Sequence, residues 1–211
     1  MADQTKLYGF DGSTYVRTVK TVLNDKGVDF DQAQINVLEG EPRQPEHLAR
    51  HPFGKVPVLD IDGIRIRETD AICRYLEDTR PDPALIPDKA REKALMNEAM
   101  SLINAYGYDA LIGAAGYHLF PEFIGGPDDD AHAECMKAAK TLLELLMENK
   151  GQAKWLAGDA PTLADYFLAP IMFYISLTPD KDALLQVPGM ADWWQAMQGV
   201  ASFKATEPDL G

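Results

Sequence analysis

Cysteine is scarce in this chain, which has only Cys73 and Cys135 among its 211 residues. A disulfide framework of the kind that holds small exported domains together is therefore excluded. Each cysteine sits among apolar residues at helical spacing, which favours a buried small side chain over a nucleophile or a disulfide partner. A chain of this length can bury a core large enough to fold without such cross-links.

Positive charge is also scarce. The chain has 20 Lys and Arg residues and 33 Asp and Glu residues, which gives a net charge of −13. Such a charge repels phosphate backbones and anionic lipid surfaces, so we expect no nucleic-acid partner. Residues 1–80 hold 11 basic and 14 acidic side chains, whereas residues 81–211 hold 9 and 19. This uneven distribution predicts two structural units.

Long apolar runs are missing too, since none approaches the roughly 18 residues that a membrane-spanning helix needs. Residues 1–8 carry polar side chains where a secretory signal would need an apolar core. We therefore expect a cytoplasmic protein that has no membrane partner.

The first 80 residues contain strand and helix patterns in the order β-α-β, loop, β-β-α. The clearest is a hairpin, because two apolar-rich runs, 56–61 and 64–67, flank the turn pair Asp62-Gly63. The other elements are a strand at 6–9, a helix after the cap Ser13-Thr14, a strand within 30–38 and a helix that starts at 68–70.

Strand patterns stop after a proline-rich segment at 81–88, which we interpret as a linker. Helical patterns follow at 89–117 and 130–150, and Thr162 with Asp165 predicts a capping box before a nearly unbroken apolar helix. The expected domains are therefore residues 1–80, of mixed α/β structure, and residues 89–211, all helical.

The chain resembles the cytosolic glutathione transferases, and the phi class and related bacterial enzymes in particular. The resemblance rests on three strings: residues 45–59 (PEHLARHPFGKVPVL), residues 68–76 (ETDAICRYL) and the capping box at 162–165 (TLAD). It implies a thioredoxin-like N-terminal domain of order β-α-β-α-β-β-α and an all-helical C-terminal domain. It also implies a homodimer that activates the thiolate of its cosubstrate glutathione for conjugation to small electrophiles, without a prosthetic group. Peroxidase activity is a further reaction open to such a site.

The resemblance implies a cis peptide bond before Pro57, which turns the backbone of Val56 outward to pair with the cysteinyl part of glutathione. An ordinary trans proline at a strand start is the alternative from local rules. Thr69 would bind the γ-glutamyl carboxylate through its hydroxyl and N–H at a helix start, and Glu68 would meet the ammonium group. The alternative for this pair is a plain helix cap.

Lys55 and Arg43 lie on loops that in this family face the glycyl carboxylate. Many phi-class enzymes have His where this chain has Pro42, so that contact is lost here or moved to Arg43. For Lys55 a ligand contact is favoured, whereas for Arg43 a solvated surface charge is equally compatible.

Ser13 matches the family's catalytic serine, which would donate a hydrogen bond to the glutathione sulfur and lower the pKa of its thiol. Thr14 is the second candidate, followed by Tyr8 and Tyr15. Ser13 also suits a simple helix cap, a role that needs no ligand.

The electrophile would bind an apolar cleft between the domains. Its candidate lining residues are Tyr106, Tyr108, Ile112, Tyr117 and Phe120, although aromatic and aliphatic residues at this spacing are more often part of a core. The four histidines, His47, His51, His118 and His132, show no metal-ligand spacing. We therefore expect no metal site.

A non-catalytic relative that binds apolar ligands or protein partners is the alternative function, because a fold does not by itself define an activity. The proline at position 42 and the loop Gly12-Ser13-Thr14-Tyr15 both depart from the usual pattern and motivate this alternative.

Overall fold

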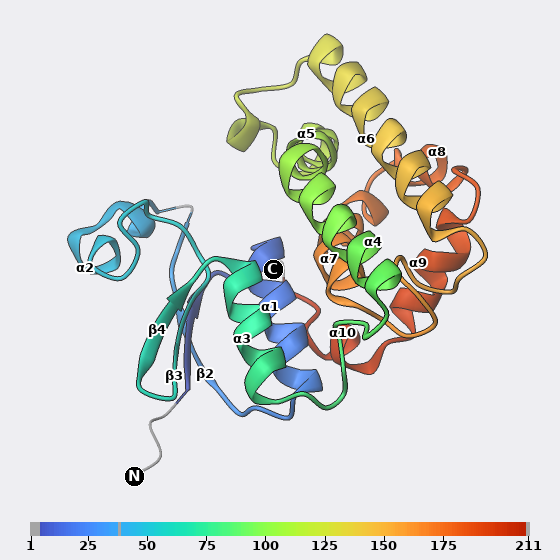
Figure 1. The fold of residues 1–211 in the computed structure, drawn as a ribbon. Helices are drawn as coiled ribbons and strands as arrows, with labels where there is room; N and C mark the ends of the chain where they lie inside the picture. Colours follow the sequence, from blue (N-terminus) through green and yellow to red (C-terminus); the bar gives the residue numbers. More distant parts are fainter. Residues whose placement is uncertain (1–4, 38, 210–211) are drawn as a thin grey trace. The chain divides into compact units, whose positions relative to one another are not determined.

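The computed structural model describes residues 5–37 and 39–209, and these divide into two units (Figure 1). The first unit contains residues up to Ala84 together with the segment that starts at Ala201, and the second unit spans Leu85–Val200. The expected second domain of 89–211 therefore differs from the structure at its end, where the chain packs with the first unit.

The first unit is built on a four-stranded mixed sheet of order β2-β1-β3-β4. Strand β1 (Lys6–Gly9) pairs in parallel with β2 (Asp31–Gln34) and antiparallel with β3 (Val58–Ile61), which pairs antiparallel with β4 (Ile64–Arg67). Strand β2 is shorter than the expected strand within 30–38, whose residue 38 lies outside the described residues. The sheet confirms the predicted thioredoxin-like topology.

The turn between β3 and β4 has positive φ at both central residues, 51° at Asp62 and 76° at Gly63. This conformation is the one that a two-residue type I′ hairpin requires, and Asp-Gly tolerates it well. The hairpin prediction is therefore confirmed.

Two long helices of the first unit, α1 (Thr14–Asp25) and α3 (Thr69–Thr79), lie side by side along the sheet (Figure 1). Their apolar residues repeat every three or four positions and are fully buried with the central strands; they include Val16, Val19, Leu23, Ile72 and Leu76. Burying each such side chain stabilises the fold by roughly 1.5–3 kcal/mol. The same unit contains a 3-10 turn, η1 (Glu41–Arg43), and the short helix α2 (Pro45–Leu48).

A buried ion pair holds the chain that follows α3 against α1. Lys26 Nζ lies 2.5 Å from Glu77 Oε2, and the Lys26 side chain is fully buried. The same ammonium donates to the carbonyl of Pro83 at 2.6 Å. The proline-rich segment is therefore attached to the first unit at its start.

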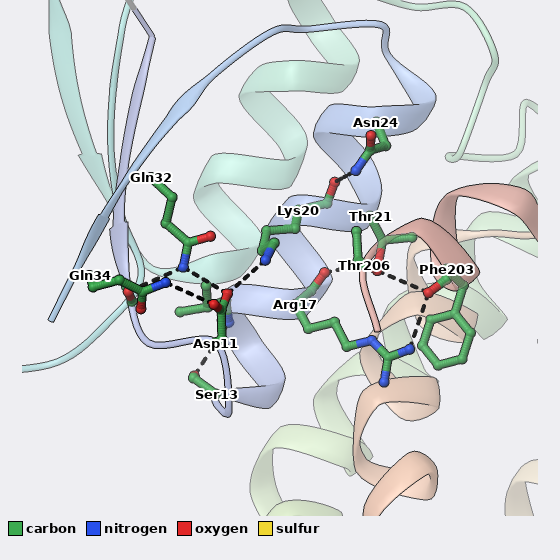
Figure 2. A network of polar contacts seen from close by, with 12 residues as sticks. Asp11, Ser13, Arg17, Lys20, Thr21, Asn24, Gln32, Gln34, Phe203 and Thr206 are labelled. Atoms are coloured by element: carbon green, nitrogen blue, oxygen red, sulfur yellow. Dashed lines mark hydrogen bonds and ion pairs between the residues drawn. The ribbon is translucent and has the colours of Figure 1, made fainter. Parts of the chain in front are cut away.

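The last helix, α10 (Ala201–Ala205), returns to α1 (Figure 2). The buried guanidinium of Arg17 donates from Nη2 to the Phe203 carbonyl at 3.1 Å and lies 3.9 Å from the centre of the Phe203 ring. The hydroxyls of Thr21 and Thr206 are 3.0 Å apart. These contacts join residues that are far apart in the sequence. Helical periodicity alone cannot reveal them, so it predicts this segment as part of the helical domain.

The second unit is helical, as expected. Its helices are α4 (Ala90–Leu102), α5 (Tyr108–Leu119), α6 (Asp129–Lys150), α7 (Leu163–Ser176), α8 (Lys181–Leu185) and α9 (Met190–Gln198), with a 3-10 turn η3 (Pro121–Ile124) after α5. Every residue from 163 to 172 is buried, so the apolar pattern of α7 correctly predicted a central helix. Among the helices that the structure describes, none has the length and apolar character required to span a bilayer.

The helical pattern expected at 89–117 is interrupted by a wide turn, η2 (Ile103–Gly107), between α4 and α5. At Gly107 a Cβ atom would lie 2.5 Å from Leu142 Cδ2 of α6. A larger residue at this position would therefore require the Leu142 side chain to move.

The predicted capping box of α7 is present. Asp165 Oδ2 accepts hydrogen bonds from the Thr162 amide (2.8 Å) and hydroxyl (2.9 Å), and Oδ1 accepts from the Leu156 amide (3.0 Å) and Trp193 Nε1 (2.8 Å). Burial raises the pKa of Asp165, and these four donors oppose that rise. The carboxylate connects three segments of the unit.

Both cysteines are free thiols. Burial raises the pKa of Cys73 and, to a smaller extent, that of Cys135. Neither thiol is therefore activated. Cys73 is buried, as expected, whereas Cys135 is only half-buried.

Candidate functional site

The loop before β3 carries the first feature of the site. The Val56–Pro57 peptide bond is cis, which confirms the expectation drawn from the resemblance. Neither the N–H nor the C=O of Val56 bonds to any residue that the structure describes, and the residue is half-buried. An extended peptide could therefore pair with Val56 as a further strand would.

Two close contacts hold this loop in place. His47, which is 2% exposed, lies with Nε2 at 2.8 Å from the Lys55 carbonyl, so that nitrogen donates. At Gly54, φ is +60° and a Cβ atom would lie 2.7 Å from the Pro42 carbonyl oxygen. Glycine is needed at this position both for its backbone conformation and for the close approach of the η1 segment.

The two predicted cationic contacts lie on these adjoining loops. The Cδ of Arg43 lies beside Gly54, while Lys55 directly precedes Val56. Both side chains are exposed, and neither forms an ion pair with a residue in the described part of the chain. They are therefore available to an anionic ligand.

The start of α3 is the second feature of the site. Glu68 precedes the helix with φ 69° and ψ 125°, a conformation that non-glycine residues rarely adopt. Its side chain is 75% exposed and does not cap the helix. The cap side chain therefore does not occupy the amides at the start of α3, where Thr69 itself is 7% exposed, and the helix dipole favours a carboxylate there.

His51 connects the loop to this helix start. Its Nε2 lies 3.5 Å from Glu68 Oε1, and its Nδ1 accepts the Phe53 amide at 3.3 Å. Burial lowers the pKa of His51, and the charge of Glu68 only partly opposes this. His51 thus lies beside the Glu68 carboxylate and links the loop to the start of α3.

Ser13 and Thr14, the two leading donor candidates, differ in accessibility. Ser13 precedes α1, is partly exposed, and its Oγ accepts the Val16 amide at 3.4 Å, so it does cap the helix. The Ser13 hydroxyl donates a hydrogen bond to no residue that the structure describes. The Thr14 residue is 5% exposed and its hydroxyl oxygen is fully buried, which separates that hydroxyl from any ligand in solvent.

Tyr8, a further candidate, is 8% exposed and donates through its hydroxyl to Asp60 Oδ2 at 3.2 Å. Its ring also lies 4.6 Å from the guanidinium of Arg50. Tyr8 is therefore occupied by contacts within the sheet, whereas Tyr15 is half-buried on α1.

A network around Asp11 fixes the loop that leads to Ser13 (Figure 2). The Asp11 carboxylate accepts from Lys20 Nζ (2.7 Å), Gln32 Nε2 (2.9 Å) and Gln34 Nε2 (2.8 Å). Burial disfavours its charge, but these donors hold the pKa of Asp11 below its usual value. Sequence reasoning missed Asp11, since only the pairing of β1 with β2 brings the two glutamines to it.

The residues predicted to contact an electrophile lie on η2, on α5 and just beyond α5. Tyr106 is 67% exposed, and Tyr108 and Ile112 are half-buried. Phe120 packs edge-on against Tyr174, and Tyr117 packs on His132. Tyr117 and Phe120 thus form contacts within the helical unit.

The fold and site define a thioredoxin-like domain, with a cis-proline loop and an open helix start, joined in one chain to a helical unit. Family models give the same division: residues 7–84 match the glutathione S-transferase N-terminal domain, and residues 108–199 match the glutathione S-transferase C-terminal domain.

Individual relatives agree. Glutathione S-transferase 1 of Zea mays is 30% identical over 194 residues, which cover 91% of this chain and 90% of the relative. The maleylacetoacetate isomerase of Rhizobium meliloti is 30% identical over 220 residues, covering 99% and 98%. The crystal structure of poplar glutathione transferase F1 superposes with a TM-score of 0.87 at 27% identity, covering 97% of both chains. The chain belongs to the glutathione S-transferase family.

Proposed function

We propose that this protein is a glutathione transferase that conjugates the glutathione thiolate to small electrophiles, with the peptide bound by the first unit. The unpaired backbone of Val56 beside the cis-proline is the observation that carries this proposal. Relatives support it, because maize glutathione S-transferase I, 28% identical with a TM-score of 0.84, has a structure in complex with an atrazine glutathione conjugate.

Each part of the tripeptide has a matching group. The cysteinyl N–H and C=O pair with the C=O and N–H of Val56. The γ-glutamyl carboxylate binds the Thr69 hydroxyl and the amides at the start of α3, and Glu68 accepts from the ammonium group. Lys55 and Arg43 neutralise the glycyl carboxylate. These local groups bind an anion although the chain carries a net charge of −13.

Ser13 is the thiolate donor in this proposal. A free thiol has a pKa of roughly 8.5, so only a few per cent is ionised at neutral pH. A hydrogen bond from the Ser13 hydroxyl, together with the positive end of α1, lowers that pKa. The hydroxyl can accept the Val16 amide and donate to sulfur at once, so its capping role does not compete.

The reaction then needs no further cofactor. The sulfur lone pair attacks an electrophilic carbon, a C–S bond forms, and either a leaving group departs with its electron pair or an activated double bond accepts a proton from water. Tyr106, Tyr108 and Ile112 of the helical unit are proposed to contact the apolar part of the electrophile. Reduction of peroxides is a second proposed reaction. The thiolate attacks a peroxide oxygen, the O–O bond breaks to release an alcohol, and a second glutathione converts the resulting sulfenic acid to the disulfide and water.

We also propose a cytoplasmic homodimer. Phe53 is 74% exposed beside the site loop, so a large apolar ring is available to a second copy of the chain. Sedimentation of the parent and of Phe53→Ser tests this: a dimer for the parent and a monomer for the variant are expected. A monomeric parent would overturn it.

The main test measures glutathione binding by calorimetry and conjugation of 1-chloro-2,4-dinitrobenzene for the parent, Ser13→Ala and Thr14→Val. Ser13→Ala should bind glutathione within a few-fold of the parent while turnover falls by about 10²–10³. Thr14→Val should keep turnover near that of the parent. Unchanged turnover in Ser13→Ala would move the donor to Thr14 or a tyrosine. No glutathione affinity at millimolar concentration, with a hydrophobic dye still bound, would favour a non-catalytic ligand-binding protein.

A further inference from the structure

The second unit brings together two histidines and an aspartate that are remote in sequence. His118 lies near the end of α5, His132 lies in the first turn of α6, and Asp180 precedes α8. Both Nε2 atoms point at the same oxygen, Asp180 Oδ2, at 2.9 Å from His118 and 2.7 Å from His132. One ligand atom from each of the three residues lies within 4.8 Å of the other two.

Two imidazole nitrogens and one carboxylate oxygen are a donor set that Zn²⁺ and neighbouring divalent transition ions prefer. Around a tetrahedral ion with ligands at about 2.0–2.1 Å, neighbouring ligand atoms are roughly 3.3 Å apart. The present hydrogen-bonded separations therefore need to open by about half an ångström for an ion to enter. Binding of an ion therefore requires small movements of these three side chains.

Protonation is also compatible with metal binding. A carboxylate only accepts, so each Nε2 now carries the hydrogen that it donates to Asp180. A cation would bind the Nε2 lone pair, with the hydrogen on Nδ1 of the same ring. Neither Nδ1 bonds to another residue of the described chain, so a hydrogen on Nδ1 would disrupt no existing hydrogen bond.

The surroundings hold the rings in place while leaving them accessible. The Tyr117 ring stacks on His132 at 4.3 Å and meets His118 edge-on at 5.0 Å, and its hydroxyl donates to Asp129 at 2.5 Å. The side chains of His118, His132 and Asp180 are 25%, 19% and 15% exposed. The acidic start of α6 adds a field that attracts cations.

We propose that His118, His132 and Asp180 form a binding site for a divalent transition-metal cation of the Zn²⁺ type, with water at the fourth position. The ion would join α5, α6 and the start of α8, and its binding would stabilise the helical unit. The site uses none of the residues proposed to bind glutathione, so the two proposals succeed or fail separately. The sequence shows no sign of a metal site, because the two histidines lie on different helices and Asp180 precedes a third, so the three residues share no local spacing.

The test uses the full chain without an affinity tag, after treatment with a chelator, and titrates it with Zn²⁺ by calorimetry. One ion per chain is expected to bind, and Co²⁺ should give the visible absorption of a low-symmetry site. His118→Gln, His132→Gln and Asp180→Asn should each weaken Zn²⁺ binding by at least tenfold, because each removes a ligand. Asp130→Asn, which removes the same charge from the exposed start of α6, should stay within about twofold of the parent.

A thermal measurement gives a second readout. Zn²⁺ at about a hundredfold excess over its dissociation constant should raise the melting temperature of the parent by roughly 5–10 °C. It should leave that of His132→Gln unchanged. Circular dichroism and glutathione binding check that each variant is folded. The proposal is overturned if the parent shows no saturable Zn²⁺ binding below about 100 μM, or if the substitutions at His118 and His132 leave affinity unchanged.

Discussion

The backbone of Glu68 offers a direct test of whether the site stores strain. Its φ of 69° with ψ of 125° costs a non-glycine residue about 1–3 kcal/mol. Replacement by glycine removes this cost but adds about 0.5–1 kcal/mol of backbone entropy to the unfolded state. The lost contact with His51 adds little, because the carboxylate is 75% exposed and the two groups are 3.5 Å apart. Glu68→Gly should therefore stabilise the chain by about 1 kcal/mol, or roughly 2–4 °C in melting temperature.

Glu68→Gln is the matched control. It removes the same charge but keeps a Cβ atom, so its stability should equal that of the parent. Both variants should bind glutathione more weakly, because neither offers a carboxylate to the ammonium group. Urea unfolding and calorimetric titration measure the two quantities separately. If Glu68→Gly were no more stable than Glu68→Gln, the strain argument would be wrong, and if both bound glutathione as the parent does, the assignment of Glu68 would be wrong.

Three further substitutions have defined outcomes. Asp165→Asn should lower the free energy of unfolding by about 2–4 kcal/mol in urea denaturation, because a neutral amide cannot accept all four donors; a change below 0.5 kcal/mol, on the scale of ordinary surface substitutions, would contradict this. Gly54→Ala should destabilise the chain and weaken glutathione binding, since its Cβ meets the Pro42 carbonyl; unchanged affinity would show that the loop adapts. The depressed pKa of Asp11 means that its contribution is present above its unfolded value near 4 and lost as pH falls through the folded value. Asp11→Asn should therefore lose less stability than the parent between pH 5 and pH 3, as measured by urea midpoints, and equal losses would refute this.

Features of the fold that depend on neighbouring residues were predictable from the sequence. The Asp62-Gly63 turn requires two left-handed residues in a row, and few other pairs supply them. The capping box needs only residues three apart, at Thr162 and Asp165, followed by an apolar helix. Both signals are local, so they do not depend on how the rest of the chain folds.

Features that depend on distant residues were not predictable in this way. Nothing about helical periodicity in 201–205 indicates a partner on α1, because the Arg17 contact spans 186 positions. The wide turn at 103–107 places Gly107 close to Leu142 of α6, a contact between distant residues that periodicity does not reveal. For the site, Val56, Pro57 and Thr69 came from motif resemblance, whereas Asp11, His47 and His51 act through contacts that only the folded chain shows.

The return of α10 to α1 makes the first unit discontinuous along the chain. During synthesis its sheet emerges first, yet the unit is complete only after the residues around Phe203 have left the ribosome. Until then the guanidinium of Arg17 lacks the carbonyl and the ring that cover it. A fragment that ends at residue 84 has the same defect, so the first unit should be produced and studied as part of the whole chain.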